Sequence, residues 1–297
     1  MSQMPEDMSA DGAQSPAVYR KRIGSTIVTA LSDGYFGLPF DVFPALDPSE
    51  GEALLRSAHR SSPPRIQVNA FVLEQRGKRI LVDTGCGARL GPTVNALRAN
   101  LAAAGVNAAS VDAILCTHIH PDHTNGLVDR RGEPLFANAE VYVHHADAAF
   151  WLSDENRAKA PDELKVQFDW AKEAFAPYQD RVRLIAPGEV LPGVEAIGLP
   201  GHTPGHCGYI VHGEGEALLI WGDVVHSLAI QVPRPEVAFA GDLDGDAARE
   251  TRSRLFDRVA ADRLLITGMH LEFPGFGYLT RDAHRFRYEP DPWSPTL

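Results

Sequence analysis

Residues 118–123 read His-Ile-His-Pro-Asp-His, and this stretch decides how the rest of the chain is interpreted. Residues 113–116 come just before it and read Ala-Ile-Leu-Cys, a short apolar run that is typical of a buried strand. On an extended segment, side chains two positions apart project to the same side, so His118 and His120 could bind one metal ion. The stretch therefore predicts a metal site where a strand ends.

The same six residues hold two more ligand-type side chains. Asp122 and His123 follow in a turn that Pro121 starts, and they could face a second ion beside the first. A lone histidine more often lies on the surface or in the core, but four ligand-type side chains directly after a buried strand favour a metal site. Neutral imidazole with carboxylate suits zinc, and also iron, manganese or cobalt.

Three further ligand-type side chains lie far along the chain, each where a strand is expected to end. His202 lies in a Gly-His-Thr-Pro-Gly-His run, Asp223 in Trp-Gly-Asp and His270 in Gly-Met-His. Strand ends along one edge of a sheet can converge on a single pocket, where loops carry chemistry on a rigid frame. We therefore expect these three side chains to complete the site.

Apolar runs in the first third of the chain predict strands of one sheet, separated by turns and loops. Residues 25–31 predict a strand that stops at a Ser-Asp-Gly turn. Residues 35–48 then predict a loop, rich in aromatic residues and proline, that could form a lid or a partner surface. Residues 68–73 and 79–82 predict two strands around a turn.

Later segments alternate between helical and extended patterns. Helices are predicted near 94–104, over most of 147–178 and over 247–261, and strands at 139–143, 183–185, 194–199, 208–211, 217–221 and 263–267. Strands early and late with helices between them predict an α/β fold of two packed sheets flanked by helices. We expect a disordered tail at 1–16 and one domain over 17–297.

Composition narrows the class of partner. The 297 residues carry a formal net charge of −11, which argues against nucleic acid or an anionic membrane as the main partner, because both reward clustered Lys and Arg. A small, neutral or weakly charged substrate fits better, and we expect it to be mostly apolar. We see no secretory signal and no membrane-spanning run, and the three cysteines include no Cys-x-x-Cys pair, so we expect a cytoplasmic protein.

The seven ligand-type positions agree in type, order and approximate spacing with the metallo-β-lactamase superfamily. The resemblance covers about residues 25–278 and rests on the H-x-H-x-D-H motif and the later His, Asp and His. It implies an αββα sandwich of two mixed sheets flanked by helices. It also implies two divalent metal ions, with His118, His120 and His202 on the first.

The resemblance extends to the roles of further residues. It implies that Asp122, His123 and His270 bind the second ion and that Asp223 bridges both. A hydroxide held between two such ions attacks a carbonyl carbon or a phosphorus atom, and Asp122 can orient it and accept a proton. Asp83 matches a position that supports the metal site as a hydrogen-bond acceptor.

Several stretches resemble one branch of the superfamily, which contains the N-acyl-homoserine lactone lactonases and methyl parathion hydrolase. Matching stretches are 68–71, 81–87, 150–152, 221–226 and 270–277. The classical β-lactamases of the superfamily place cysteine where Asp223 falls, so this chain departs from them. The branch implies an aromatic and aliphatic substrate wall, for which the candidates are Phe36, Phe40, Trp151, Phe273 and Phe276, and His226 is a candidate supporting residue of the metal site.

We therefore predict a lactone, ester or phosphotriester hydrolase that uses a metal-bridging hydroxide. The alternatives are a hydrolytic dehalogenase of aromatic compounds, an iron-dependent redox enzyme on the same ligands, and a metal-stapled binding module without turnover. Relatives in this branch are often dimers, so the aromatic loop at 35–48 could supply a homodimer interface. Zinc is the first expectation for the metal.

Overall fold

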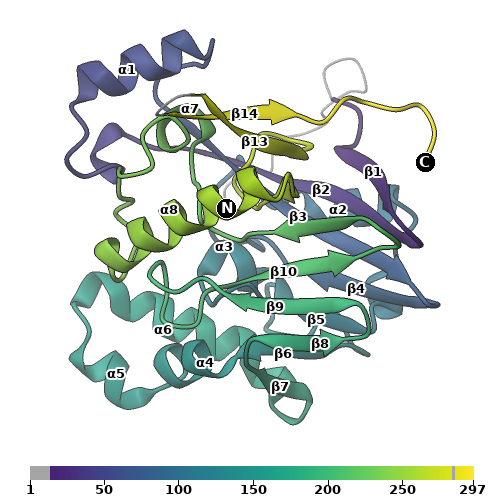
Figure 1. The fold of residues 1–297 in the computed structure, drawn as a ribbon. Helices are drawn as coiled ribbons and strands as arrows, with labels where there is room; N and C mark the ends of the chain where they lie inside the picture. The colour runs from purple at the N-terminus through teal and green to yellow at the C-terminus, as the bar shows by residue number, and fades with distance from the viewer. Residues whose placement is uncertain (1–13, 283–284) are drawn as a thin grey trace.

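The computed structural model describes residues 14–282 and 285–297 (Figure 1). Its strands form two mixed sheets, one from each half of the chain. The first sheet contains, from edge to edge, β1 (Val18–Ile23), β2 (Thr26–Gly37), β3 (Arg65–Gln75), β4 (Lys78–Val82), β5 (Ala113–Leu115), β6 (Glu140–His144) and β7 (Val182–Ile185). The second contains β14 (Arg285–Pro290), β13 (Gly277–Asp282), β12 (Leu265–Thr267), β11 (Ala217–Ile220), β10 (Cys207–His212), β9 (Val194–Gly198) and β8 (Gly188–Leu191).

Strand direction brings several strand ends to one edge. In the first sheet, β4 to β7 run parallel to one another, whereas β1 to β4 pair antiparallel. In the second sheet, β11 and β12 form a parallel pair. Parallel neighbours share the edge at which they end, so the loops after β4, β5, β11 and β12 can meet.

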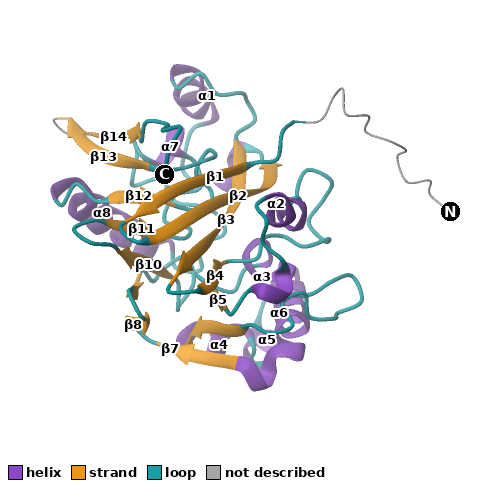
Figure 2. Ribbon diagram, turned by 90° about the vertical axis from the view of Figure 1, so that its right-hand side faces the viewer, coloured by secondary structure: helices purple, strands orange, loops and turns teal. Residues whose placement is uncertain are grey.

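Helices cover the outer faces of both sheets (Figure 2). In Figure 2, α8 lies on the side of the second sheet, and α2, α3 and α6 lie on the side of the first. The α-helices are α1 (Pro48–Ser57), α2 (Leu97–Ala103), α3 (Pro121–Thr124), α4 (His145–Trp151), α5 (Asp154–Lys159), α6 (Asp162–Phe175), α7 (Leu228–Gln231) and α8 (Gly245–Ala261). Short 3₁₀ turns are η1 (Phe40–Val42), η2 (Ala108–Ser110), η3 (Asn125–Leu127) and η4 (Ala176–Arg181).

Strand β3 shows why the sequence forms layers. Its residues alternate between two apolar clusters: Ala70 and Val72 pack with the helices that cover the first sheet, whereas Phe71 and Leu73 pack between the sheets. All four side chains are fully buried. Successive residues of a strand point to opposite faces, so a continuous apolar run fits a sheet that is covered on both sides. The arrangement confirms the predicted αββα sandwich.

Strand β2 does not stop at the predicted Ser-Asp-Gly turn but continues to Gly37. The pairing register shifts at Asp33, whose carboxylate accepts hydrogen bonds from the backbone N–H groups of Cys86 at 2.8 Å and Leu97 at 2.7 Å. These bonds anchor a bulge inside the strand, so turn-type residues bend β2 without ending it. The prediction of a strand end here is wrong, and the connecting segment shortens to residues 38–47.

Most of the sheet edges, strand β13 and several helices were not predicted. Strands β1, β8, β13 and β14 and helices α1 and α7 lie where the sequence shows only brief or polar patterns. Edge strands need apolar residues on one face only, so their signal is weak. Residues 1–13 of the predicted tail lie outside the described residues. We propose that residues 17–297 form one domain, because the two sheets share the apolar cluster between them.

Among the helices of the described residues, none combines the length and the apolar character that a membrane crossing requires.

Candidate metal centre

The seven predicted ligands meet at one edge of the sandwich. The stretch with His118 and His123 follows β5, His202 follows β9, Asp223 follows β11 and His270 follows β12. The side chains of His118, His123, His202, Asp223 and His270 are buried, and that of Asp122 is partly exposed. The loops after strands of both sheets therefore converge, as the strand directions allow.

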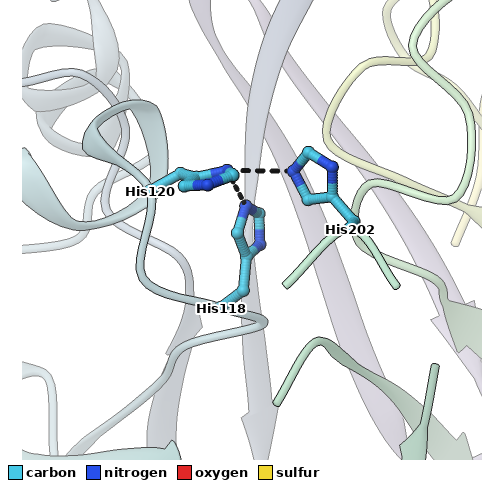
Figure 3. A group of neighbouring side chains, drawn as sticks. All are labelled: His118, His120 and His202. Carbon is cyan, nitrogen blue, oxygen red and sulfur yellow. Dashed lines mark hydrogen bonds between the residues drawn. The ribbon is translucent and has the colours of Figure 1, made fainter. Parts of the chain in front are cut away.

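One group of nitrogens belongs to His118, His120 and His202 (Figure 3). Nε2 of His118 lies 3.0 Å from Nδ1 of His120, and this Nδ1 lies 2.9 Å from Nε2 of His202. Figure 3 shows the three rings pointing at one another, with His118 and His120 on one loop and His202 on another. The arrangement offers three nitrogen ligands to one ion.

A second group contains Asp122, His123, Asp223 and His270. Nε2 of His123 lies 3.4 Å from Oδ2 of Asp122 and 3.3 Å from Oδ2 of Asp223. Nε2 of His270 lies 3.5 Å from Oδ2 of Asp122 and 2.8 Å from Oδ2 of Asp223. Oδ2 of Asp223 also lies 3.3 Å from Nε2 of His202, so one carboxylate oxygen borders both groups.

The outer ring nitrogens of the ligands are held by acceptors. Nδ1 of His123 lies 2.7 Å from Oδ2 of Asp83, and Nδ1 of His202 lies 2.9 Å from Oδ1 of Asp242. Nδ1 of His270 lies 2.6 Å from the carbonyl oxygen of Gln67. A carbonyl or carboxylate oxygen only accepts, so each Nδ1 carries a proton and each Nε2 faces the centre, where it offers a lone pair whenever the ring is neutral.

The contacts and unpaired atoms at the centre show whether metal ions fit the site. The 2.8 Å contact between Nε2 of His270 and Oδ2 of Asp223 needs positive charge, which either a proton on Nε2 or a metal ion beside the two atoms would supply. Within the described residues, Nε2 of His123 and Oδ1 of Asp223 are buried without a hydrogen-bond partner. Unpaired buried polar atoms are costly, and divalent ions would satisfy them. The donor set therefore fits two metal ions.

The pKa values describe the same preference for positive charge. Burial alone would raise the pKa of Asp223, but the charges of His123 and His270 hold it well below its usual range. Burial alone would lower the pKa of His202, but hydrogen bonds with Asp223 and Asp242 raise it to about 9. The carboxylates thus stabilise cationic charge at the centre, which either protons or metal ions can supply.

The predicted supporting residue Asp83 lies directly behind the ligands. Its Oδ1 accepts from the backbone N–H of Thr117 at 2.7 Å, and its Oδ2 accepts from the Thr117 hydroxyl at 2.7 Å and from His123. The Thr117 oxygen lies 3.0 Å from Nδ1 of His118 and accepts from it, because the hydroxyl proton points to Asp83. One buried carboxylate thereby orients a ligand of each group.

The other candidate supporting residue, His226, also lies at the centre. Its Nε2 is 3.4 Å from Oδ2 of Asp223. His206, in the same run as His202, holds the backbone instead: it donates from Nδ1 to the carbonyl of Leu199 at 2.8 Å and accepts from the N–H of Asp223 at 2.9 Å.

Three residues that support the site were not predicted. Asp242 pairs with His202, and Arg252 of α8 lies 4.0 Å from Asp242 and donates to three backbone carbonyls. Asp147 of α4 accepts from the N–H groups of Ile119 at 2.7 Å and Gly205 at 2.6 Å, so it ties the two ligand loops together. Asp242 lies 40 residues from its partner, and no spacing rule in one sequence links such positions.

A cavity of about 400 Å³ opens above the ligands, and Asp122, His120 and His270 lie in its lining. Apolar side chains form most of the remaining wall: Phe36, Leu38, Ile66, Leu90, Leu164, Trp170, Phe239 and Leu243. None of the lining residues is Lys or Arg. The cavity therefore combines a metal-binding floor with a mostly apolar, uncharged wall.

Of the predicted substrate wall, Phe36 lines this cavity, whereas Phe40, Trp151, Phe273 and Phe276 are not among its lining residues. Trp151 is fully buried behind His120, with ring centroids 5.2 Å apart. Phe40 packs against α1, and Phe273 and Phe276 pack in the cluster between the sheets. An aromatic side chain near a site can pack in the adjacent apolar core instead of lining the cavity. Its position in the sequence does not show which of the two it does.

Comparison with known proteins gives a consistent picture. The sequence model of the family described as the Metallo-beta-lactamase superfamily matches residues 63–270. N-acyl homoserine lactonases from Bacillus cereus and a Bacillus species are 24% identical over 153 residues and 28% identical over 155. Each match covers 52% of this chain and 53% of the relative, so the chain spans about half the length of these curated relatives.

Solved structures resemble nearly the whole chain. The hydrolase AbOPH of the beta lactamase superfamily superposes with a TM-score of 0.91 at 32% identity, over 95% of this chain and 100% of that one. AidC, a dizinc quorum-quenching lactonase, superposes with a TM-score of 0.88 at 24% identity, over 94% of this chain and 99% of that one. The second likeness shows the fold alone.

Proposed function

Because the chain belongs to the metallo-beta-lactamase superfamily, we propose that it is a metal-dependent hydrolase with a dinuclear centre, acting on an uncharged lactone, ester or phosphotriester. One observation carries the proposal: Oδ2 of Asp223 borders two groups of ligand atoms on the floor of an apolar cavity. A shared carboxylate oxygen suits two ions that act together.

We propose that His118, His120 and His202 hold one ion, and that the second group holds the other through Asp122, His123 and His270. Asp223 would serve both. Two divalent ions in these positions would supply an activated water nucleophile and polarise the oxygen of the electrophile. With five imidazoles and two carboxylates, the donor set favours zinc, and iron, manganese or cobalt suit it as well.

Asp122 has the properties of the proton acceptor. Its side chain is 19% exposed, whereas those of His123 and Asp223 are almost wholly buried, and it lines the cavity. Burial alone would raise its pKa, but the charge of His123 and the hydrogen bond with it hold the pKa well below its usual range. An ionised carboxylate at the cavity floor can orient a water molecule and accept its proton.

The cavity wall supports an uncharged substrate. The lining contains no Lys or Arg that could pair with the extra charges of a phosphate monoester or a carboxylate-rich substrate. Lactones, carboxylic esters and phosphotriesters are neutral, and their apolar groups can bury against the wall. The names of the curated relatives favour lactones with an acyl amide as the first class to test.

We also propose a cytoplasmic location, which the three free, buried cysteines support, since disulfides are rare in that compartment. A small molecule would be the partner. The homodimer stays a prediction, and sedimentation velocity of the purified protein would test it.

Purified protein with two equivalents of Zn²⁺ should hydrolyse at least one of three probes: an N-acyl homoserine lactone, a p-nitrophenyl ester and a diethyl aryl phosphotriester. Activity should disappear with a chelator and in Asp122→Asn, and return when Zn²⁺ is restored to the wild type. A fully metal-loaded protein that hydrolyses none of the three would contradict the proposal.

A further inference from the structure

The ring of His226 lies beside the metal centre. Its Nε2 is 3.4 Å from Oδ2 of Asp223, and together with His202 these residues offer three ligand atoms within 4.8 Å of one another. We propose that Nε2 of His226 is an additional ligand of the ion that His118, His120 and His202 hold. This inference rests on the metal centre proposed above.

Two stacking contacts fix the plane of the His226 ring. It stacks on Phe239 with ring centroids 3.7 Å apart and an interplanar angle of 15°. On His270 the corresponding values are 5.0 Å and 24°. A ring stacked in this way cannot tilt freely, so the direction of Nε2 toward Asp223 is a property of the fold.

The backbone of His226 is fixed as well. Its N–H donates to Oε1 of Gln231 at 2.7 Å, and the amide nitrogen of Gln231 donates to the carbonyl of Val237 at 3.1 Å. Gln231 is itself fully buried. The side chain of Gln231 therefore links the backbone of residue 226 to that of residue 237 and holds His226 at the centre.

Within the described residues, the ring nitrogens of His226 make no hydrogen bond. The residue is 2% exposed, and both ring nitrogens are buried without a hydrogen-bond partner. The neighbouring buried His206, by contrast, has both nitrogens paired with backbone groups. A buried imidazole that pairs with nothing is costly, and coordination through Nε2 would satisfy one of its two nitrogens.

The competing role is a hydrogen bond from Nε2–H to Oδ2 of Asp223. That oxygen already has Nε2 of His270 at 2.8 Å, and those of His123 and His202 at 3.3 Å each. The 3.4 Å separation from His226 is longer than any of these and beyond the usual range of such bonds. Three other ring nitrogens therefore lie closer to Oδ2 than His226 does, which favours the lone pair of Nε2 acting on an ion.

Coordination by His226 would also affect which metal the protein binds. An added imidazole makes the donor set of the first ion richer in nitrogen, and nitrogen-rich sites favour Zn²⁺ and Co²⁺ over Mn²⁺ and Mg²⁺. His226 would thus tune which metal the protein retains, in addition to how tightly it retains it.

The test compares His226→Gln with His226→Phe and with the wild type, using metal alone as the probe. Gln keeps an N–H that can donate to Asp223 but is a poor ligand, and Phe keeps the stack on Phe239. His212→Gln is the matched control, because His212 is exposed and pairs with Glu195.

Chelator competition should show that both His226 variants bind one of the two Zn²⁺ ions at least about tenfold more weakly, with a smaller loss for Mn²⁺. The visible spectrum of the Co²⁺ protein should change in both variants and stay unchanged in His212→Gln. Wild-type affinity and spectrum in His226→Gln would overturn the proposal.

A measurement on the wild type avoids any dependence on folding of the variants. Histidine-selective ¹⁵N NMR of the Zn²⁺-loaded protein should show His226 with its proton on Nδ1 and with Nε2 bearing no proton. A proton on Nε2 would identify a donor to Asp223 and overturn the proposal. Wild-type protein that binds no Zn²⁺ at all would instead contradict the metal centre itself, so the two failures are distinguishable.

Discussion

The backbone N–H of Asp223 donates to Nε2 of His206 at 2.9 Å, while His206 donates from Nδ1 to the carbonyl of Leu199 at 2.8 Å. The ring is therefore held as one neutral tautomer between a donor and an acceptor. Through it, the segment that follows β9 sets the position of the carboxylate that both groups of ligands share.

Removal of this ring should destabilise the protein. His206→Leu leaves the buried N–H of Asp223 and the carbonyl of Leu199 unpaired, which costs about 1–3 kcal/mol for each unsatisfied group. Urea unfolding of the metal-free protein would measure the loss in unfolding free energy. The exposed-site variant His212→Leu should change it by less than about 0.5 kcal/mol. Equal stabilities for the two variants would contradict this role of His206.

Acid should destabilise the metal-free protein in a defined window. Burial lowers the pKa of His206 to about 3 and that of His226 to about 4, against an unfolded value of 6.5. Above pH 6.5 both rings are neutral in both states and contribute nothing. As the pH falls from 6.5 toward 3, these histidines bind protons in the unfolded chain but not in the folded protein. The free energy of unfolding therefore falls. Unfolding free energies measured between pH 8 and 4 would check this, and a flat profile below 6.5 would contradict it.

Alkaline pH should strengthen metal binding. The pKa of His202 is raised to about 9 in the metal-free protein, since its hydrogen bonds with Asp223 and Asp242 outweigh burial. Its proton stabilises the metal-free fold below pH 6.5, and that stabilisation is lost as the pH rises through 9. Zn²⁺ must displace the proton, so affinity should rise between pH 6 and 9. Calorimetry in buffers of different ionisation enthalpy would detect the released proton, and an affinity independent of pH would contradict the prediction.

The carboxylate behind His202 should control metal affinity. Asp242→Asn keeps the shape but removes the charge that His202 faces at 2.9 Å, so affinity for Zn²⁺ should fall about 10–100-fold. Asp257→Asn, an exposed carboxylate on α8, is the control. Chelator competition measures both variants, and equal affinities would show that Asp242 does not support the ligand.

Two tryptophans near the site should behave differently. Trp170 lines the cavity, so Trp170→Ala should lower kcat/KM more for long-chain than for short-chain acyl lactones, by up to about fourfold per methylene that loses its contact. Trp151 is fully buried, so Trp151→Ala should cost about 3–5 kcal/mol of stability. Steady-state kinetics on lactones of increasing chain length test Trp170→Ala, and urea unfolding tests Trp151→Ala. An equal loss of kcat/KM at all chain lengths for Trp170→Ala would contradict its place in the substrate wall.

The ligand positions could be predicted because they follow from local rules. His118 and His120 alternate on a strand end, and His202, Asp223 and His270 each follow a strand. The structure brings all seven predicted side chains together, and their binding of metal stays a proposal. Asp83, which directly follows β4, was predicted from the resemblance to the superfamily.

The rest of the site depends on tertiary packing, which single-sequence patterns do not contain. Asp242 reaches His202 across 40 residues, and Asp147 bridges two loops from α4. The resemblance to the lactonase branch suggested Trp151 for the substrate wall, but the side chain is fully buried and packs against Phe168 in the core. The local pattern of apolar residues predicts which side chains are buried, but it does not show which residues they contact in the folded protein.

We propose that two ions share Asp223. Anomalous diffraction from a crystal of the Zn²⁺-loaded protein, collected at the zinc edge, would test it most directly. We predict two peaks, one beside His118, His120 and His202 and one beside Asp122, His123 and His270, with Oδ2 of Asp223 next to both. A single peak, or none, at full zinc loading would contradict the account.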